Sequence, residues 1–223
     1  MSNYFNKAAE CMTLAEKKAL QSEKLIKIVK YVYEAQKPYR EKMDDIKLKP
    51  SDIKSIDDLY KLPFTEKKDL RNSYPFGMFA APMRDITRIH ASSGTTGKLT
   101  VAGSTAKDIA VWGECCARAI VAAGGSVEDI VHVCYGYGLF TGGLGLHYGA
   151  EALGATCIPA SSGNTDKQLT LIKDFGATII ACTPSYAVHI AEEFAKSGSD
   201  GKQELQLRLG SVGAAPGTEA LRR

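Results

Sequence analysis

The first third of the chain lacks glycine: none of the 21 glycines in the 223 residues comes before Gly77. Glycine marks tight turns and helix ends, so a segment without it is typical of helices joined by short connections. The glycine-rich remainder is typical of an α/β fold with many loops. We therefore predict a helical segment over residues 1–80, an α/β subdomain over residues 81–209 and the start of a further segment over residues 210–223.

Long apolar runs and an excess of one charge are also missing. No stretch approaches the roughly 20 apolar residues that a membrane span needs, and residues 1–18 do not resemble a signal peptide. The net charge is +3 with both signs interspersed, so neither nucleic acid nor a membrane is expected as a partner. The six cysteines have no C-x-x-C spacing, and we interpret them as reduced core residues of a cytoplasmic protein.

The amino-terminal segment has apolar residues at helical spacing. Leu14–Gln36 is predicted as a helix that Pro38 stops, and Pro38–Ile46 as a second helix. Short helical stretches follow. The hydroxyl residues that we predict as amino-terminal caps are Ser22, Ser51, Ser55 and Thr65.

From Ile86 onward, apolar runs alternate with amphipathic stretches. The predicted strands are Ile86–Ala91, Val101–Ser104, Asp129–Tyr135, Ala155–Pro159, Thr178–Thr183 and Gln206–Val212. The predicted helices are Thr105–Ala123, Leu144–Leu153, Asp166–Phe175 and Ser185–Lys196. Apolar strands each followed by a helix predict a parallel sheet covered on both faces, with the site in the loops at the strands' carboxyl ends.

The stretch from His90 to Gly103 places hydroxyls, glycines and one lysine between two apolar runs. Such a loop can hold an anion, because glycines let backbone N–H groups converge and a lysine adds a mobile charge. It is not a Walker A loop, since Ser92 stands where the first glycine is required and Leu99 follows Lys98. A surface turn rich in serine, threonine and glycine is the alternative interpretation.

Other motifs carry weaker signals. Gly143, Gly145 and Gly149 spell G-x-G-x-x-x-G, which leaves an NADP-dependent reductase as one alternative, but no acidic residue ends Ala155–Pro159 to hold a ribose. No G-x-S-x-G or H-x-x-x-H occurs, so neither a serine hydrolase nor a metal site is predicted. Of the four histidines, His132 and His189 are interpreted as structural, whereas His90 and His147 could be structural or functional.

Three motifs resemble a known family. Ser92-Ser93-Gly94-Thr95-Thr96-Gly97-Lys98 is similar to the phosphate-binding signature of adenylate-forming ligases. The stretch from Tyr135 to Gly145 and the pentapeptide Cys182-Thr183-Pro184-Ser185-Tyr186 resemble phenylacetate–coenzyme A ligases, with similarity from about Leu25 to the last residue. The resemblance implies a truncated large domain of the adenylate-forming fold that activates an arylacetate with ATP, releases pyrophosphate and passes the acyl group to coenzyme A.

The resemblance also implies roles for individual residues. Ser92, Ser93, Gly94, Thr95, Thr96, Gly97 and Lys98 would hold the phosphates of ATP with Mg²⁺, with Thr95 and Lys98 as the catalytic residues. Tyr135, Phe140 and Gly142 would line the aryl pocket. Gly213, Ala214, Ala215 and Pro216 would contact adenine, although relatives often carry an acidic residue at the position of Ala215.

The resemblance covers the amino-terminal half of such a ligase. Relatives continue with an acidic motif, an aspartate for the ribose and a small domain with a catalytic lysine. We therefore expect these residues to be inactive alone and to form a homodimer or a larger self-association through an uncovered sheet edge. A non-catalytic nucleotide-binding module, or a complete shorter protein, is the alternative. The choice among phenylacetate, a hydroxyphenylacetate and indoleacetate stays open.

Overall fold

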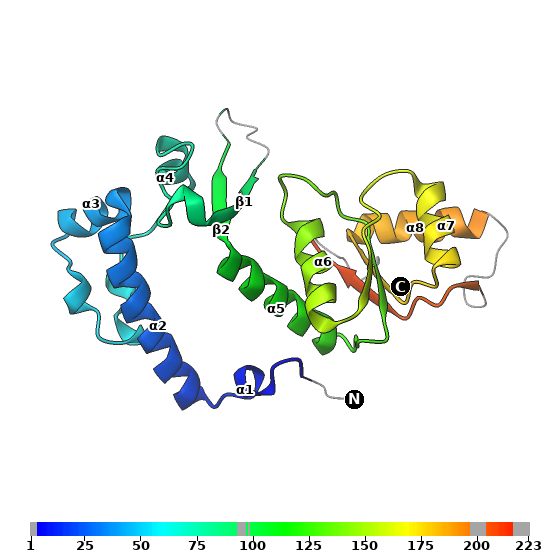
Figure 1. Cartoon of the computed structure of the whole chain (residues 1–223), viewed down its shortest axis with the longest axis horizontal. Coiled ribbons are helices and arrows are strands. Elements are labelled where there is room, and N and C mark those ends of the chain that lie inside the picture. The colour runs from blue at the N-terminus through cyan, green and yellow to red at the C-terminus, as the bar shows by residue number, and fades with distance from the viewer. Residues whose placement is uncertain (1–3, 93–96, 98, 197–203, 216–223) are drawn as a thin grey trace. The chain divides into compact units, whose positions relative to one another are not determined.

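The chain forms two compact units in a computed structural model that describes residues 4–92, 97, 99–196 and 204–215. One unit comprises Lys7–Lys107, and the other comprises Met1–Asn6 with Asp108–Arg223. Figure 1 shows helices in the first unit and a sheet with helices in the second. The boundary after Lys107 differs from the predicted change of domain at residue 80, because the first two strands group with the helices.

The first unit is mostly helical, as predicted. Its elements are α1 (Lys7–Glu10), α2 (Leu14–Ala35), α3 (Lys37–Asp45), η1 (Pro50–Asp52), η2 (Ile56–Lys61), α4 (Lys67–Asn72), η3 (Met83–Asp85), β1 (Ile86–Ala91) and β2 (Val101–Thr105). Leu25 and Val29 from α2, Met43 from α3, and Leu48 and Ile53 after it form its buried core. The helical spacing of apolar residues in α2 is therefore the signal that positions this core.

Several caps differ from the prediction. Thr13 caps α2 through a reciprocal capping box with Glu16. The hydroxyl of Ser22, inside α2, donates to the Lys18 carbonyl and accepts the N–H of Ile56. Ser22 thus ties η2 to α2. Lys49 and Glu66, and neither Ser51 nor Thr65, precede η1 and α4, where Asp52 and Asp69 accept the cap N–H groups. Ser55 caps η2 as predicted.

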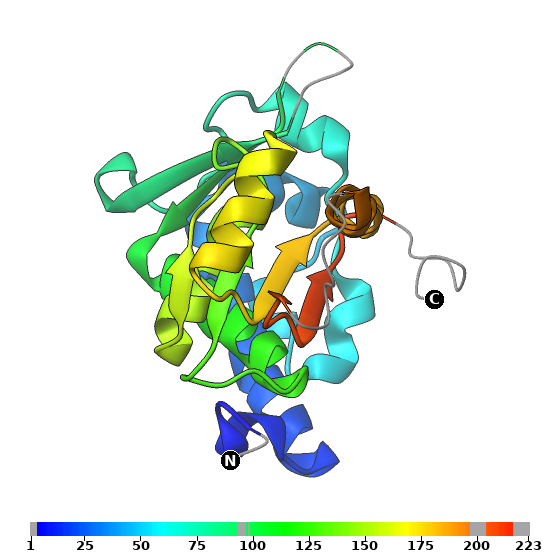
Figure 2. The same ribbon diagram turned by 90° about the vertical axis from the view of Figure 1, so that its right-hand side faces the viewer.

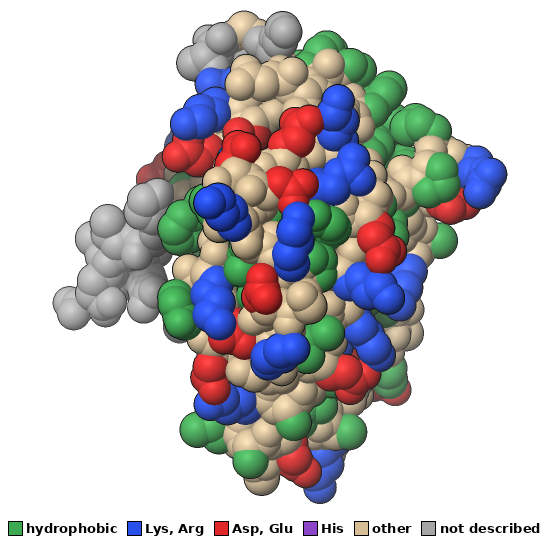
Figure 3. Space-filling view, turned by 90° about the vertical axis from the view of Figure 1, so that its left-hand side faces the viewer, with side chains coloured by type: hydrophobic (Ala, Val, Ile, Leu, Met, Phe, Trp, Pro, Cys, Tyr) green, Lys and Arg blue, Asp and Glu red, His purple; other side chains and the backbone are tan. Residues whose placement is uncertain are grey.

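Charges of both signs alternate on the surface shown in Figure 3, which displays no large area of a single sign. Ion pairs within the first unit include Lys42 with Asp69 at 2.6 Å and Lys18 with Asp57 at 2.8 Å. These pairs are partly or fully solvated, so each adds little to stability.

Strands β1 and β2 form an antiparallel hairpin, with His90 opposite Ala102 and Ala91 opposite Val101. Phe79 lies against the hairpin: a methyl group at Gly103 would stand 2.5 Å from its ring. This close contact explains why the hairpin belongs to the helical unit rather than to the parallel sheet.

The second unit is the predicted α/β sandwich. Its elements are α5 (Ala106–Ala122), β3 (Ile130–Val133), α6 (Gly142–Leu153), β4 (Thr156–Ile158), α7 (Thr165–Asp174), β5 (Ile179–Cys182), α8 (Pro184–Lys196) and β6 (Leu209–Val212). The four strands are parallel in the order β4-β3-β5-β6, and β5 and β6 run side by side in Figure 2. Left-handed glycines follow α5 and α6, at Gly124 and Gly154, as predicted for helix ends.

Helices cover both faces of the sheet because side chains alternate along the strands. On one face Val131 and Val133 of β3 meet Ile120 of α5 and Ala150 of α6. On the other face Ile180 and Cys182 of β5 meet Ile172 of α7 and Ile190 of α8. The prediction of a parallel sheet buried on both sides is confirmed.

Candidate functional site

The strand order creates a crevice at the carboxyl edge of the sheet. After β3 the chain turns to α6 on one face, whereas after the neighbouring β5 it turns to α8 on the other face. Loops that diverge from adjacent strands leave a gap between them, and this switch point is where open α/β sheets bind ligands. The loop from Cys134 to Thr141, which carries most of the predicted aryl residues, starts at that point.

Tyr135 joins three segments at this edge. Its hydroxyl donates a hydrogen bond to the Cys182 carbonyl at the end of β5, and it accepts the N–H of Gly213 at 3.1 Å. Partial burial raises the pKa of Tyr135 above its ordinary value, so the hydroxyl stays protonated and can donate. One side chain therefore holds the segment after β6 against the end of β5.

A hollow of about 300 Å³ opens beside Tyr135, entirely within the second unit. It is lined by Trp112, Cys116, Tyr135, Thr141, Gly142, Gly145, Leu146, Ser211, Val212, Gly213 and Ala214. Among the residues predicted for the aryl pocket it includes Tyr135 and Gly142, and among those predicted for adenine it includes Gly213 and Ala214. Segments 70 or so residues apart in the chain thus meet at one hollow, whose volume suits a small molecule.

The segment after β6 has an uncommon backbone. Ala214 has a φ of 65°, in the left-handed region that residues with a Cβ rarely adopt. The hydrogen bond between Gly213 and Tyr135 fixes the residue before it. Ala215 is exposed, and Pro216 lies outside the described residues.

Phe140 is not among the residues that line the hollow. Its side chain is 60% exposed, in the same loop as Tyr135 and Gly142. Gly142 begins α6, and a methyl group there would stand 3.7 Å from the Tyr135 ring, in ordinary contact. The structure thus brings two of the three predicted aryl residues together and leaves the third at the surface.

Seven lining residues are not among the predicted site residues. Trp112 and Cys116 come from α5, Thr141 directly precedes α6, Gly145 and Leu146 lie in α6, and Ser211 and Val212 come from β6. Trp112 is the one tryptophan of the chain, and its position one turn before Cys116 was the available signal. The sequence alone does not show which side of α5 faces α6, so it does not show that these two side chains reach the hollow.

The glycines of α6 explain the G-x-G-x-x-x-G spacing. A methyl group at Gly143 would stand 2.9 Å from the carbonyl oxygens of Tyr135 and Gly136, and one at Gly149 would stand 2.5 Å from the Cys116 side chain. These glycines therefore let the loop after β3 and the helix α5 approach α6 closely. Close packing of α6 therefore accounts for the G-x-G-x-x-x-G spacing, and no dinucleotide-binding role is needed to explain it.

A cluster of titratable groups lies at the middle of α6. His147 Nε2 is 3.1 Å from Glu151 Oε1, and its Nδ1 is 3.4 Å from both Tyr137 Oη and Cys157 Sγ. Burial raises the pKa of Cys157 to about 11 and also raises that of Tyr137. Both groups therefore stay protonated at neutral pH, and the cluster holds the loop after β3 against α6 and β4 rather than offering a nucleophile.

His132 is structural, as predicted. It is fully buried in β3, and its Nε2 is 2.6 Å from Gln168 Oε1 on α7. Because the amide oxygen can only accept, Nε2 carries the proton. Gln168 in turn donates to the carbonyls of Ser161 and Gly163 at 2.8 and 3.1 Å. This chain of hydrogen bonds fixes the loop after β4, whose Ser162 lies beside Gly136.

The predicted phosphate loop connects β1 and β2 in the first unit. Ser92 and Thr100 close its base, with the Ser92 N–H donating to the Thr100 carbonyl at 3.0 Å and the Thr100 N–H to Ser92 Oγ at 3.3 Å. Gly97 has a φ of 110°, which only glycine adopts readily. Ser93, Gly94, Thr95, Thr96 and Lys98, and with them both predicted catalytic residues, lie outside the described residues.

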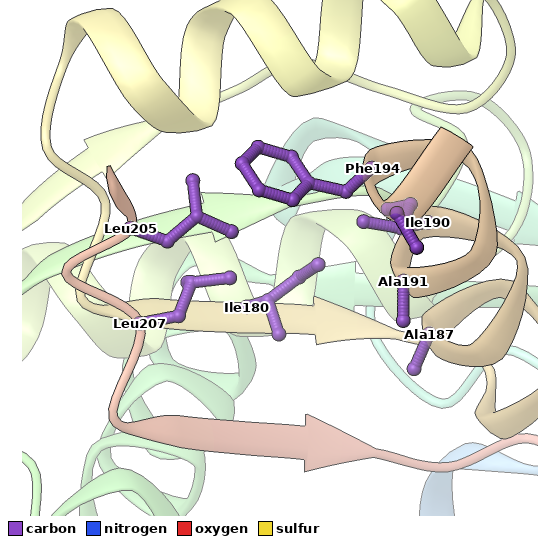
Figure 4. A pocket seen from close by; sticks show the side chains of 8 residues that line it. Ile180, Ala187, Ile190, Ala191, Phe194, Leu205 and Leu207 are labelled. Carbon is purple, nitrogen blue, oxygen red and sulfur yellow. The ribbon is translucent and has the colours of Figure 1, made fainter. Parts of the chain in front are cut away.

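A second hollow, of about 320 Å³, lies between α8 and the approach to β6. Figure 4 shows aliphatic and aromatic side chains turned toward it, among them Ile180, Phe194 and Leu207. Its eight lining residues are alanine, isoleucine, leucine and phenylalanine, with no side chain that could bind a charged group. It therefore does not suit a nucleotide.

The part of the chain that the structure describes contains neither a cluster of metal ligands nor a membrane-spanning helix. Within it, no three His, Cys, Asp or Glu side chains gather so as to hold a metal ion. Within the same ranges, no helix has both the length and the apolar character needed to cross a membrane.

Comparison with curated proteins gives strong matches, although no protein-family model matches the chain. The chain is 50% identical over 216 residues to a phenylacetate-coenzyme A ligase of Thermus thermophilus, covering 96% of this chain and 48% of the relative. It is 52% identical to the ligase of the same name from Aromatoleum evansii, over 93% of this chain and 47% of that relative. The Escherichia coli ligase is 50% identical, over 96% and 49%.

Solved structures of a CoA ligase also match the fold of the chain. A 2-hydroxyisobutyryl-CoA ligase, in complex with 2-HIB-AMP and CoA in the thioesterification state, superposes with a TM-score of 0.87 at 28% identity. That match covers 93% of this chain and 46% of the ligase. An open conformation of the same ligase gives a TM-score of 0.91 at 26% identity, over 99% and 53%.

The matches confirm the resemblance that the three motifs indicated and the adenylate-forming fold that it implied. The chain spans about half the length of the curated relatives it matches. Over about half of their length, the chain is similar in sequence to the phenylacetate–coenzyme A ligases, and it shares the fold of an AMP-forming CoA ligase.

Proposed function

We propose that this chain supplies the acid-binding and ATP-binding part of an AMP-forming ligase that joins an arylacetate to coenzyme A. The observation that carries the proposal is the hollow at the switch point of the sheet, where Tyr135 and Gly142 meet Gly213 and Ala214. Identity of about 50% to curated phenylacetate–CoA ligases supports the same reaction.

The chemistry explains why one hollow should serve two ligands. The arylacetate carboxylate attacks the α-phosphorus of ATP, the bond to the bridging oxygen breaks, and pyrophosphate leaves. Coenzyme A sulfur then attacks the acyl carbon of the mixed anhydride and AMP leaves. The acid and the adenosine end of ATP must therefore be held side by side, because in-line attack depends on position.

In this scheme the residues of the chain bind and orient. Tyr135 and Gly142 contact the aryl ring, whereas Phe140 of the same loop lies outside the hollow. The backbone of residues 213–216 contacts adenine. Residues 92–98 hold the phosphates, with Lys98 neutralising charge and Thr95 donating a hydrogen bond. Mg²⁺ bound to ATP would supply further neutralisation. The residues that line the hollow include no carboxylate to hold the ion, so we derive no step through it.

A chimera tests the proposal directly. Residues 1–223 are joined to the part of the Escherichia coli relative that lies beyond the matched region, and formation of AMP and phenylacetyl-CoA is measured with ATP·Mg²⁺, phenylacetate and coenzyme A. We expect turnover that depends on all three substrates. Turnover that persists without the acid, or none in a chimera that is folded and binds ATP, would contradict the proposal and favour a non-catalytic nucleotide-binding module.

The phosphate loop has its own variants in the same chimera. Lys98→Ala and Thr95→Ala each remove a charge-assisted or hydroxyl contact, so each should lower kcat/KM for ATP by about 30-fold to 1,000-fold, the effect typical of losing one preorganised donor. Acid binding should be nearly unchanged. Lys107→Ala, which removes a lysine just beyond the hairpin, is the matched control. Equal ATP kinetics in all three variants would remove the loop from the mechanism.

A further inference from the structure

One side of the hollow at the sheet edge is apolar. Trp112 and Cys116 of α5, with Gly145 and Leu146 of α6, form this side, whereas Ser211 to Ala214 come from β6 and the segment after it. An adenine ring needs partners for several hydrogen-bonding atoms, whereas a phenyl ring needs none. The side formed by α5 and α6 therefore suits the apolar end of a carboxylic acid.

Trp112 is held firmly on this side. Its indole hydrogen-bonds to the Cys116 side chain, and its ring meets that of Tyr148 edge-on, with centroids 6.5 Å apart. Contacts of both kinds fix the orientation of an aromatic ring. The Trp112 indole is thus held in one orientation, and it forms a rigid wall of the hollow.

Gly145 determines where that wall stands. A methyl group built at Gly145 would lie 2.6 Å from Trp112 Nε1 and 2.7 Å from both Cε2 and Cζ2. No real Cβ sits so close to three ring atoms. The indole therefore occupies the space that any larger residue at position 145 would fill, and it reaches this position because residue 145 has no side chain.

We propose that Trp112, seated on Gly145, is the residue that limits the size of the acid admitted to this hollow. The inference rests on the proposed function and adds to it a specificity-determining residue outside the motifs that resemble known ligases. With the indole in place, a single ring such as that of phenylacetate fits against the wall. A longer acid, such as biphenyl-4-acetate, would need the space that the indole fills.

The chain carries its own reporter for this test, because Trp112 is its single tryptophan. Phenylacetate is titrated into the 223-residue chain while indole emission is recorded, and calorimetry measures the affinity for phenylacetate, for biphenyl-4-acetate and, separately, for ATP·Mg²⁺. Phenylacetate should shift or quench the emission at the concentrations where calorimetry shows binding. ATP·Mg²⁺ binding is followed because it reports on the proposed function independently of the acid.

Two variants test the wall itself. Trp112→Phe shortens it and should raise the affinity for biphenyl-4-acetate relative to phenylacetate by about tenfold, the effect of gaining contact over part of a ring. Gly145→Ala pushes the indole, so it should shift the emission of the free protein and weaken phenylacetate by about tenfold. Val111→Ala, on the exposed side of α5 beside Trp112, is the matched control and should change neither quantity.

The outcomes separate the two proposals. Phenylacetate binding with unmoved emission, or an unchanged ratio of the two acids in Trp112→Phe, would overturn the role of Trp112 and leave the proposed function standing. Failure of both acids to bind while ATP·Mg²⁺ binds would also overturn it. If ATP·Mg²⁺ fails too, the proposed function itself is contradicted. Should Gly145→Ala not fold, Trp112→Phe and the emission of the unaltered chain decide the matter.

Discussion

Tyr135 performs two tasks with two parts of one side chain. Its ring lines the hollow, and its hydroxyl bridges the Cys182 carbonyl and the Gly213 N–H. The glycine-rich surroundings of Tyr135 mark it in the sequence, but they do not reveal the bridge, because the bridge joins positions 78 residues apart. The two tasks can be separated by substitution, because phenylalanine keeps the ring and removes the hydroxyl.

We predict that Tyr135→Phe lowers the free energy of unfolding by about 1 kcal/mol, the net worth of a partly buried hydrogen bond, while phenylacetate binding changes less than about threefold. Tyr135→Ala should also lose the contact with the ring, which is worth roughly 1.5–3 kcal/mol of binding. Urea unfolding and calorimetry on the same samples measure the two effects. Equal loss of phenylacetate binding in both variants would show that the hydroxyl, and not the ring, matters to the ligand.

His132 makes the protein sensitive to acid. Burial lowers its pKa below the ordinary value, and the hydrogen bond with Gln168 only partly offsets this. The unfolded chain, with an ordinary pKa of 6.5 for this residue, therefore takes up a proton that the folded chain does not. Stability contributed by neutral His132 is present above pH 6.5 and is lost as the pH falls below that value.

We predict that the free energy of unfolding depends more steeply on pH in the unaltered chain than in a variant without His132. Between pH 6.5 and 5 the unfolding free energy of the unaltered chain should fall by up to about 1.4 kcal/mol per pH unit more than that of His132→Gln, which keeps an N–H donor for Gln168 but does not titrate. Urea midpoints at a series of pH values measure this. His189→Gln, a histidine on α8 near Thr165, is the control. Parallel curves for His132→Gln and the unaltered chain would show that His132 protonates equally in both states.

At the scale of elements, one ion pair anchors β6. Asp129, which directly precedes β3 and is only 3% exposed, accepts hydrogen bonds from Arg208 Nε at 3.0 Å and Thr178 Oγ1 at 2.7 Å. Arg208 also donates to the Gly124 carbonyl at 3.1 Å. Burial raises the pKa of Asp129, but the hydrogen bonds from Thr178 and Arg208 outweigh it and hold the pKa below its usual value. The carboxylate thus stays charged and ties the residue before β6 to β3 across β5.

Arg208→Ala should lower the free energy of unfolding by about 2 kcal/mol. Removing one partner of a buried ion pair costs more than this, but the Arg208 side chain is 46% exposed and water screens part of the interaction. Urea unfolding measures the loss, with Lys173→Ala, which breaks an exposed pair with Glu204, as the control. If the two variants lose the same stability, β6 is held by its strand hydrogen bonds alone.

Strands and helices were largely predictable, because each is set by local spacing of apolar residues. The runs around Val131, Ile158 and Ile180 are short, apolar and separated by amphipathic stretches, which only a parallel sheet covered on both faces accommodates. Caps were less predictable. Any hydroxyl near a helix start satisfies the pattern, and Ser22 instead uses its hydroxyl to hold η2.

The site was predictable in part for a related reason. Tyr135 and Gly213 come just after strands, and Gly142 begins the helix that follows the loop of Tyr135, so the order of strands and helices places all three at the same sheet edge. Trp112 stands in the middle of a helix that precedes the sheet, and its side chain reaches the hollow only because Gly145 makes room for it. The fit between Trp112 and Gly145 depends on how α5 and α6 pack together, so it cannot be predicted from the sequence of either helix alone.

At the scale of the whole molecule, the predicted phosphate loop and the hollow belong to different units of the chain. The loop lies in the unit Lys7–Lys107 and the hollow in the unit that begins again at Asp108. The relatives that the chain matches are about twice its length. Under the proposed function, residues 1–223 provide groups for binding the acid and ATP, and the chimera tests whether the part of the relative beyond the matched region completes the enzyme.

The sheet also predicts how the 223-residue chain behaves in solution. Among the described strands β6 is an edge, with its outer row of backbone N–H and carbonyl groups unpaired by any strand there, and the apolar hollow of Figure 4 lies next to it. Exposed strand edges pair readily with a second copy. We therefore expect the isolated chain to form dimers or larger assemblies at micromolar concentration.

Gly210→Lys tests this expectation at the edge itself. Gly210 is exposed in the middle of β6, and a Cβ there would meet nothing closer than Val212 at 3.8 Å, so a lysine fits without disturbing the fold. A charge on an edge strand blocks pairing between copies, and light scattering after gel filtration should then give the mass of a monomer. Gly138→Lys adds the same charge in a loop where a Cβ has nothing within 4 Å, and it should leave the assembly intact. Loss of the assembly in both variants would mean that net charge, and not the β6 edge, controls association.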